Sequence, residues 1–188
     1  MYYVLQVAPG AEDKTETHIE AILPDDIYGH CFHPTRHMRK RFHGVWKDMH
    51  EKLLPGYVFI TTDDIEAVFI RLKRVPMLTN ILGRDGDCFI KLADHEIQWL
   101  EKLLQLGAGR QPGGQNNGSG NRYEAAISQI GFDEGNEIKI ISGPLKDMEG
   151  MVKKINLHKR TAEVEVEFMG RKTAVYLGIE LLVDKQQG

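Results

Sequence analysis

A strand, a loop containing glycine and a second strand follow one another in the last third of the chain, and this pattern constrains the fold most. Ile138 and Ile140 alternate with polar residues, which predicts that both point inward from one strand. Gly143-Pro144 ends that strand, and Gly150 is expected to supply the positive φ of a return turn before Val152 begins the next strand. The pattern predicts a small β-structure.

Further short strands are expected in the same part of the chain. The predicted strands cover residues 137–142, 151–157, 162–168, 171–177 and 179–183, with a short helix over 123–130 before them. Five short strands in a row are typical of a small β-barrel.

Residues 107–122 contain many glycines and almost no apolar side chain that a core could bury. Such a composition favours a flexible linker. The linker divides the 188 residues into a domain over 1–106 and a domain over 123–188, each near the size at which one core suffices.

The front part mixes both kinds of element. Strands are expected at 2–7, 27–33, 53–60, 78–82 and 88–92, and helices at 11–23, 65–72 and around 97–104. This order predicts an α+β fold, in which helices flank an antiparallel sheet.

The net charge is −3, yet one short stretch is strongly basic. Its cations are Arg36, Arg39, Lys40, Arg41 and Lys47. Phe42 and Trp46 lie among them, and aromatic rings among cations suit unpaired, stacked bases. The alternative is an ordinary solvated hairpin.

A second set of cations lies in the last domain, near the expected turns and strand edges. The set comprises Lys146, Lys153, Lys154, Lys159, Arg160, Arg171 and Lys172. These side chains are candidates for contacts with a phosphate backbone. The alternative is again solvated turns, because Glu163, Glu165 and Glu167 share one strand face and offset the charge.

Short motifs at the front of the chain occur in a characteristic order. They are Tyr3–Gln6 with Gly10, Pro34-Thr35, Leu54–Phe59, and Arg71 with Val75-Pro76 leading to Thr79–Gly83. Together with the pattern over 138–155, they make the whole chain resemble the NusG family. The front part resembles the N-terminal NGN domain of that family, and the last part resembles its KOW module.

The resemblance implies a non-enzymatic, monomeric transcription elongation factor whose N-terminal domain docks on the clamp helices of RNA polymerase. By position, the docking residues are expected on an exposed apolar side of the sheet, at Tyr3, Leu53, Leu54 and Tyr57. The alternative for each of them is ordinary core packing.

The chain departs from the general factor at two positions. General NusG proteins place phenylalanines in the KOW loop that meets a ribosomal protein or Rho, whereas this chain has Leu145 and Met148. With the basic stretch, this difference makes the chain resemble LoaP, a specialised antiterminator. The resemblance implies recruitment by a nucleic-acid signal. The preferred signal is an RNA hairpin in a transcript leader, and the other candidate is single-stranded DNA of the transcription bubble.

Two other functions stay open: a general NusG factor that contacts Rho or the ribosome, and a free-standing RNA-binding module that does not act on polymerase. No set of acid, base and nucleophile predicts an enzyme, and no cofactor is expected. His30, Cys31, His33 and His37 lack the spacing of a metal site. With only two cysteines and no signal or membrane-spanning stretch, a cytoplasmic location is expected.

Overall fold

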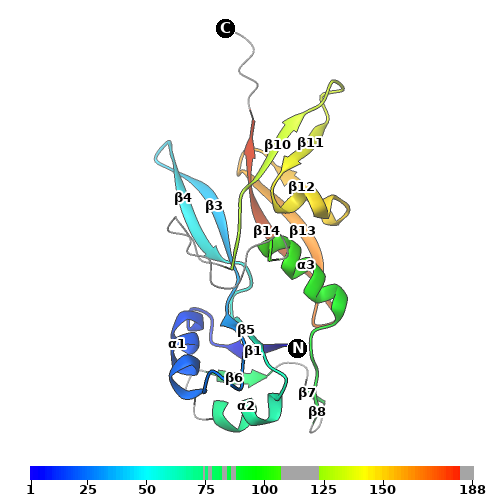
Figure 1. Cartoon of the computed structure of the whole chain (residues 1–188). Coiled ribbons are helices and arrows are strands. Elements are labelled where there is room, and N and C mark those ends of the chain that lie inside the picture. The colour runs from blue at the N-terminus through cyan, green and yellow to red at the C-terminus, as the bar shows by residue number, and fades with distance from the viewer. Residues whose placement is uncertain (74, 76–77, 82–83, 86–87, 107–122, 183–188) are drawn as a thin grey trace. The chain divides into compact units, whose positions relative to one another are not determined.

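The computed structural model describes residues 1–73, 75, 78–81, 84–85, 88–106 and 123–182 (Figure 1). The chain divides into two compact units. The first unit consists of Met1–Pro34 and Leu54–Ile97, and the second consists of Thr35–Leu53 and Gln98–Gly188.

The first unit is built on an antiparallel sheet of four strands in the order β2-β5-β1-β6. Their bounds are β1 (Tyr2–Val7), β2 (Cys31–Phe32), β5 (Tyr57–Thr61) and β6 (Leu78–Ile81). A separate short ladder pairs β7 (Arg84–Asp85) with β8 (Cys88–Phe89). Strand β1 lies between two neighbours, and its residues Tyr3, Val4, Leu5 and Val7 are buried.

Two helices complete the core of the first unit, α1 (Glu12–Ile22) and α2 (Ile65–Leu72). Their buried apolar residues belong to the same cluster as those of β1 and β5. The N-terminus of α2 is capped by Asp64, whose side chain accepts a hydrogen bond of 2.9 Å from the backbone N–H of Ala67. The helix spacing read from the sequence therefore gives the observed helices.

Helix α3 (Asp94–Leu104) passes from the first unit into the second. Within the second unit, Trp99 packs edge-on against Phe168 at a centroid distance of 6.4 Å. Its indole Nε1–H donates a hydrogen bond of 2.8 Å to the backbone oxygen of Glu167. The polar end of the buried indole is therefore satisfied.

A curled sheet of five strands forms the main body of the second unit, in the order β11-β10-β14-β13-β12. The strands are β10 (Ser128–Phe132), β11 (Ile138–Ser142), β12 (Val152–Asn156), β13 (Thr161–Phe168) and β14 (Arg171–Leu181). A 3-10 segment, η1 (Pro144–Met151), joins β11 to β12. In β13 the apolar residues are buried and the glutamates between them are not, so the predicted alternation is confirmed.

A second sheet of the same unit contains β3 (Thr35–Phe42), β4 (Val45–Lys52) and β9 (Glu124–Ala125), in the order β4-β3-β9. Strands β3 and β4 form a hairpin over Thr35–Lys52, called the basic hairpin below. His43 and Gly44 both have positive φ, as a two-residue turn of this kind requires.

The basic hairpin lies directly against β14, and Gly178 makes this approach possible. A Cβ atom at Gly178 would collide with the backbone oxygen of His37 and would lie 3.3 Å from the Cα atom of Met38. The side chain of Ile127 would be 3.1 Å away. Only a residue without a side chain fits between these strands.

The expected helix over 123–130 is wrong, because these residues form β9 and the beginning of β10. Pairing explains the difference: β9 runs parallel to β3, and β10 pairs with both β11 and β14. These partners outweigh the local helix preference of a short stretch.

Other details of the last part also differ from the expectation. Residues 171–177 and 179–183 were expected as two strands, but β14 runs from Arg171 to Leu181 without a break, and β10 is the fifth strand. The positive φ that was expected at Gly150 occurs instead at Gly143. Ile140 is buried, whereas Ile138, on an edge strand, is 39% exposed.

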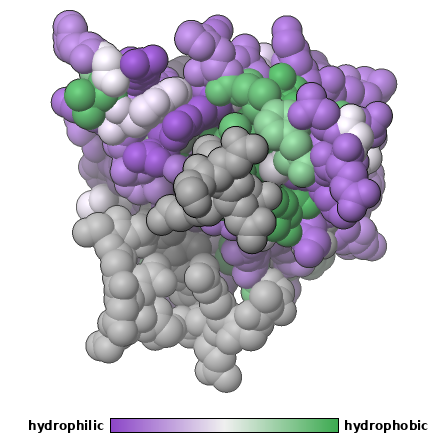
Figure 2. All heavy atoms as spheres, turned by 90° about the horizontal axis from the view of Figure 1, so that it is seen from above, coloured by the Kyte–Doolittle hydropathy of each residue, from purple (hydrophilic) through white to green (hydrophobic). Residues whose placement is uncertain are grey.

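The predicted fold class is confirmed: a front sheet with helices is followed by a five-stranded sheet of the KOW type. The domain boundaries stay a prediction, since the linker over 107–122 lies outside the described residues. No helix in the described part of the chain is long and apolar enough to cross a membrane. Figure 2 shows hydrophobic residues gathered among hydrophilic ones on one face.

Candidate nucleic-acid interface

Most cations of strand β3 have acidic partners on β4, although the basic stretch itself contains no acid. The antiparallel register places Glu51 opposite Arg36 and Asp48 opposite Arg39. Arg36 Nη2 lies 3.2 Å from Glu51 Oε2, and Arg39 Nε lies 3.6 Å from Asp48 Oδ1. Lys40 also forms an ion pair with Glu51. The hairpin is therefore less basic than its β3 sequence.

These contacts shift the titration of both acids. A hydrogen bond from Lys40 lowers the pKa of Glu51, and the positive charges of Lys40 and Arg36 lower it further. These effects outweigh partial burial, which raises the pKa. The hydrogen bond between His37 and Asp48 lowers the pKa of that carboxyl, and Arg39 adds to the effect. Both acids therefore stay ionised beside the cations at neutral pH.

Two arginines of β3 link the basic hairpin to β14. Arg36 Nη1 donates a hydrogen bond of 2.8 Å to the backbone oxygen of Tyr176. Arg39 Nη1 lies 2.6 Å from Glu180 Oε1. Both guanidinium groups therefore hold the hairpin in place.

Three cations near the hairpin tip and the β12–β13 turn have no ion-pair partner within the described residues: Arg41, Lys47 and Lys159. Their side chains are exposed. Arg41 Nε donates a hydrogen bond of 3.1 Å to the backbone oxygen of Gly44, which leaves its charge uncompensated. These three are the cations of this region best suited to contact phosphates.

Arg160 brings the β12–β13 turn and the basic hairpin together. Its backbone has a φ of 53°, which turns the chain sharply before β13 begins. Its Cζ atom lies 4.0 Å from the ring centroid of Trp46, a cation–π contact. Glu180 Oε1 is 3.7 Å from Arg160 Nη1, so one carboxylate serves both Arg160 and Arg39.

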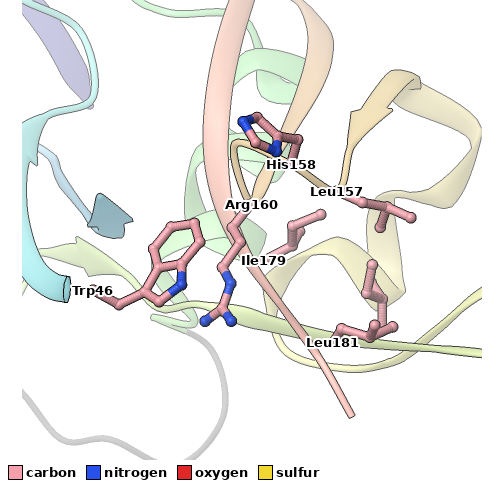
Figure 3. A pocket seen from close by; sticks show the side chains of 7 residues that line it. Trp46, Leu157, His158, Arg160, Ile179 and Leu181 are labelled. Carbon is pink, nitrogen blue, oxygen red and sulfur yellow. The ribbon is translucent and has the colours of Figure 1, made fainter. Parts of the chain in front are cut away.

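A pocket of about 220 Å³ opens beside this contact (Figure 3). Its lining is Trp46, Ile130, Leu157, His158, Arg160, Ile179 and Leu181. In Figure 3, Trp46 and Arg160 lie on one side, and Leu157 and Leu181 lie on the other. The pocket thus combines an aromatic ring, a planar cation and an apolar wall.

The remaining predicted cations of the last domain are not brought to this pocket by any observed contact among the described residues. Lys153 and Lys172 share Glu165, at 3.5 and 3.4 Å. Lys146, Lys154 and Arg171 are exposed. A role for these five in nucleic-acid binding stays a prediction.

The residues predicted to dock on polymerase are mostly buried. Tyr3, Leu53 and Leu54 are 5%, 3% and 4% exposed, so the expected exposure is wrong for them. Tyr3 belongs to the core cluster of the first unit, and burial and the charge of Asp63 raise the pKa of its hydroxyl. Tyr57 is half-buried at the start of β5. Whether any of the four contacts polymerase stays a prediction.

Sequence reasoning singled out Trp46 and Arg160 but missed the apolar wall of the pocket. Leu157 lies two residues before Lys159, and its exposed fraction of 41% is high for a leucine. Ile179 and Leu181 alternate on β14 and therefore share one face. The sequence shows this alternation, but the proximity of Ile179 and Leu181 to Trp46 depends on tertiary packing. Among the described residues, no group of three or more His, Cys, Asp or Glu side chains forms a metal site.

Comparison with known proteins agrees with this architecture of a helix-flanked sheet and a KOW-type sheet. Residues 1–101 match the family described as "Transcription termination factor nusG", and residues 134–167 match the KOW motif. The first match covers more than half of the chain. The chain therefore belongs to the NusG family, and it is a NusG-type transcription factor.

Individual relatives are distant but extend over nearly the whole chain. The "Transcription termination/antitermination protein NusG" of Escherichia coli (strain K12) is 24% identical over 181 residues, which cover 94% of this chain and 91% of that protein. The protein of the same name from Buchnera aphidicola subsp. Acyrthosiphon pisum (strain APS) is 23% identical over equal coverage. The structure described as "Domain interaction in Thermotoga maritima NusG" has a TM-score of 0.56 at 22% identity and covers 94% of this chain and 92% of that chain.

Proposed function

We propose that this protein is a specialised elongation and antitermination factor of the LoaP type. It binds RNA polymerase, suppresses pausing and termination, and is recruited to particular operons by a nucleic-acid signal. A hairpin in a leader RNA is the preferred signal, and single-stranded DNA of the transcription bubble is the other source. The role is non-catalytic and belongs in the cytoplasm with the polymerase. Membership of the NusG family supports an action on transcription.

The segment between β11 and β12 carries the distinction from a general factor. Where general NusG proteins present phenylalanines to a ribosomal protein or Rho, this chain has Leu145 and Met148, which are 0% and 2% exposed. The backbone N–H of Leu145 also donates a hydrogen bond of 3.0 Å to Ser128 Oγ. Neither side chain is aromatic and both are buried, so this loop offers such a partner no aromatic surface. This observation favours the specialised factor.

A general elongation factor is the second candidate. It is favoured by the relatives named "Transcription termination/antitermination protein NusG", which match nearly the full chain. Transcript profiling after deletion of the gene separates the two candidates. The specialised factor predicts changes in a few long operons, and the general factor predicts changes across the genome.

Binding to polymerase can be measured directly with an isolated clamp-helix fragment. Tyr57 is the best candidate for contact, since it is the partly exposed member of the four predicted docking residues. Tyr3, Leu53 and Leu54 are buried, so Tyr57 is the member that the substitution tests.

We expect Tyr57→Ala to weaken binding to the fragment on the order of 10-fold, as loss of an aromatic interface residue often does. Phe132→Ala is a matched control, because Phe132 is an aromatic residue, 47% exposed, in the second unit. No binding of the unaltered protein to the fragment would instead favour a free-standing RNA-binding module.

A further inference from the structure

We propose that the pocket between Trp46 and Leu181 binds one unpaired nucleobase of a single-stranded nucleic acid. The inference rests on the proposed recruitment by nucleic acid and adds the place and the chemistry of the contact. All residues that line the pocket belong to the second unit. The pocket therefore depends on the packing of the basic hairpin against the KOW-type sheet.

The size of the pocket suits a base. Its volume of about 220 Å³ lies below the roughly 300–1,000 Å³ typical of sites for larger small molecules. A single flat ring system is the kind of group that enters such a space, while the sugar and phosphates stay outside. Double-stranded nucleic acid does not offer such a group, because its bases are stacked and paired.

The pocket offers flat surfaces on which a base can stack. Arg160 lies over the ring of Trp46 at 4.0 Å, so the indole supports the guanidinium plane from one side. Bases in single-stranded RNA stack on aromatic rings and on guanidinium planes alike. Leu157 and Leu181 supply apolar contact around the rest of the base.

Polar groups at the pocket fit the other parts of a nucleotide. The imidazole of His158 can donate or accept a hydrogen bond at a base edge. Lys159 is adjacent in the chain to Arg160. Lys47 follows Trp46 on β4, so its side chain lies on the opposite face of the hairpin. Arg41 pairs with Trp46 across the hairpin, so both side chains lie on one face of it.

Arg41 and Lys159 are exposed and have no ion-pair partner among the described residues, so they are available to phosphates beside the pocket. The acid closest to the stack, Glu180, is already paired with Arg39 and Arg160. The charges around the pocket therefore complement the phosphates outside it. The group inside the pocket is expected to be neutral, as a base is.

The test measures binding of the full chain to a labelled single-stranded RNA oligonucleotide by fluorescence anisotropy at several salt concentrations. A second RNA of equal length and charge carries abasic nucleotides, which remove the stacking partner and leave the protein unchanged. A single-stranded DNA of the same sequence distinguishes the two sources: equal affinity indicates that either strand enters, and tighter RNA binding indicates RNA.

We expect Trp46→Ala to raise the Kd for RNA on the order of 10-fold, the size expected for loss of one stacked base. The dependence of Kd on salt should stay unchanged, because no charge is lost. Arg160→Lys keeps the positive charge but removes the planar guanidinium group, and it should also weaken binding. Lys159→Ala should instead reduce the salt slope by about one. Lys14→Ala, in the exposed surface of α1, is the matched control.

Abasic RNA should bind the unaltered protein as weakly as intact RNA binds Trp46→Ala, and the two changes should not add. Equal affinity for intact and abasic RNA, or unchanged binding by both Trp46→Ala and Arg160→Lys, would overturn the pocket assignment while leaving nucleic-acid recruitment intact. Absence of any binding to RNA or DNA by the unaltered protein would overturn the recruitment itself.

Discussion

Replacement of Gly178 by alanine tests the packing of the basic hairpin on β14. The new methyl group would collide with the backbone oxygen of His37 and would lie 3.1 Å from Ile127 Cγ1. Because a backbone atom cannot rotate away as a side chain does, the strands must separate or the backbone must shift. Overpacking of this kind costs about 1–3 kcal/mol. We therefore expect the free energy of unfolding to fall by that amount.

Separation of the strands has a local signature as well. It would weaken the hydrogen bond from Arg36 to the backbone oxygen of Tyr176 and the ion pair between Arg39 and Glu180. Urea unfolding gives the global change, and amide hydrogen exchange along β3 gives the local one.

Gly150→Ala is the matched control for this substitution. No atom lies within 4 Å of the Cβ position at Gly150, and its φ is not positive. Alanine there should be neutral or stabilise by up to about 1 kcal/mol, because it restricts the unfolded chain. The reasoning is refuted if Gly178→Ala and Gly150→Ala unfold alike and β3 exchanges equally slowly in both.

Two further substitutions test smaller parts of the structure. Asp64→Ala removes the side-chain cap on the N–H of Ala67, and we expect it to lower the free energy of unfolding by about 0.5–2 kcal/mol in a urea titration, whereas Asp64→Asn should retain most of the stability. Glu51 has a lowered pKa, so its contribution to stability is present above its unfolded value near 4.5 and is lost as the pH falls through the folded value. Unfolding followed from pH 7 to pH 3 should therefore show a smaller loss for Glu51→Gln than for the unaltered protein, and identical pH profiles would contradict the ion pairs with Arg36 and Lys40.

Local patterns predicted the elements that depend on neighbours in the sequence. The spacing of Ile65, Val68 and Leu72 predicts α2, and the side chains are buried as that spacing requires. The alternation in β13 likewise gives the face that Val164 and Val166 bury. These patterns are sufficient because one face of each element must meet a core.

Elements that depend on distant partners were not predictable in the same way. Nothing local in residues 123–130 indicates that β9 runs parallel to β3, since the partner lies almost ninety positions earlier in the chain. The pairing of Arg36 with Glu51 depends on the hairpin register, which the sequence alone does not specify for a polar hairpin.

The candidate site shows the same limit. The composition of the basic stretch identified Trp46 as a base-stacking candidate, and the turn after β12 identified Arg160. Their contact and the apolar wall arise from tertiary packing across Gly178. Sequence thus proposed the chemistry, and the structure brought the two residues together.

Transcription in vitro with purified RNA polymerase tests the central claim most directly. Two templates carry the same terminator, one with and one without the leader of a controlled operon, and read-through is measured with and without the protein. We expect read-through to rise several-fold on the template with the leader only, and Trp46→Ala to remove that rise. Equal read-through on both templates, or no effect of the protein on either, would contradict the account.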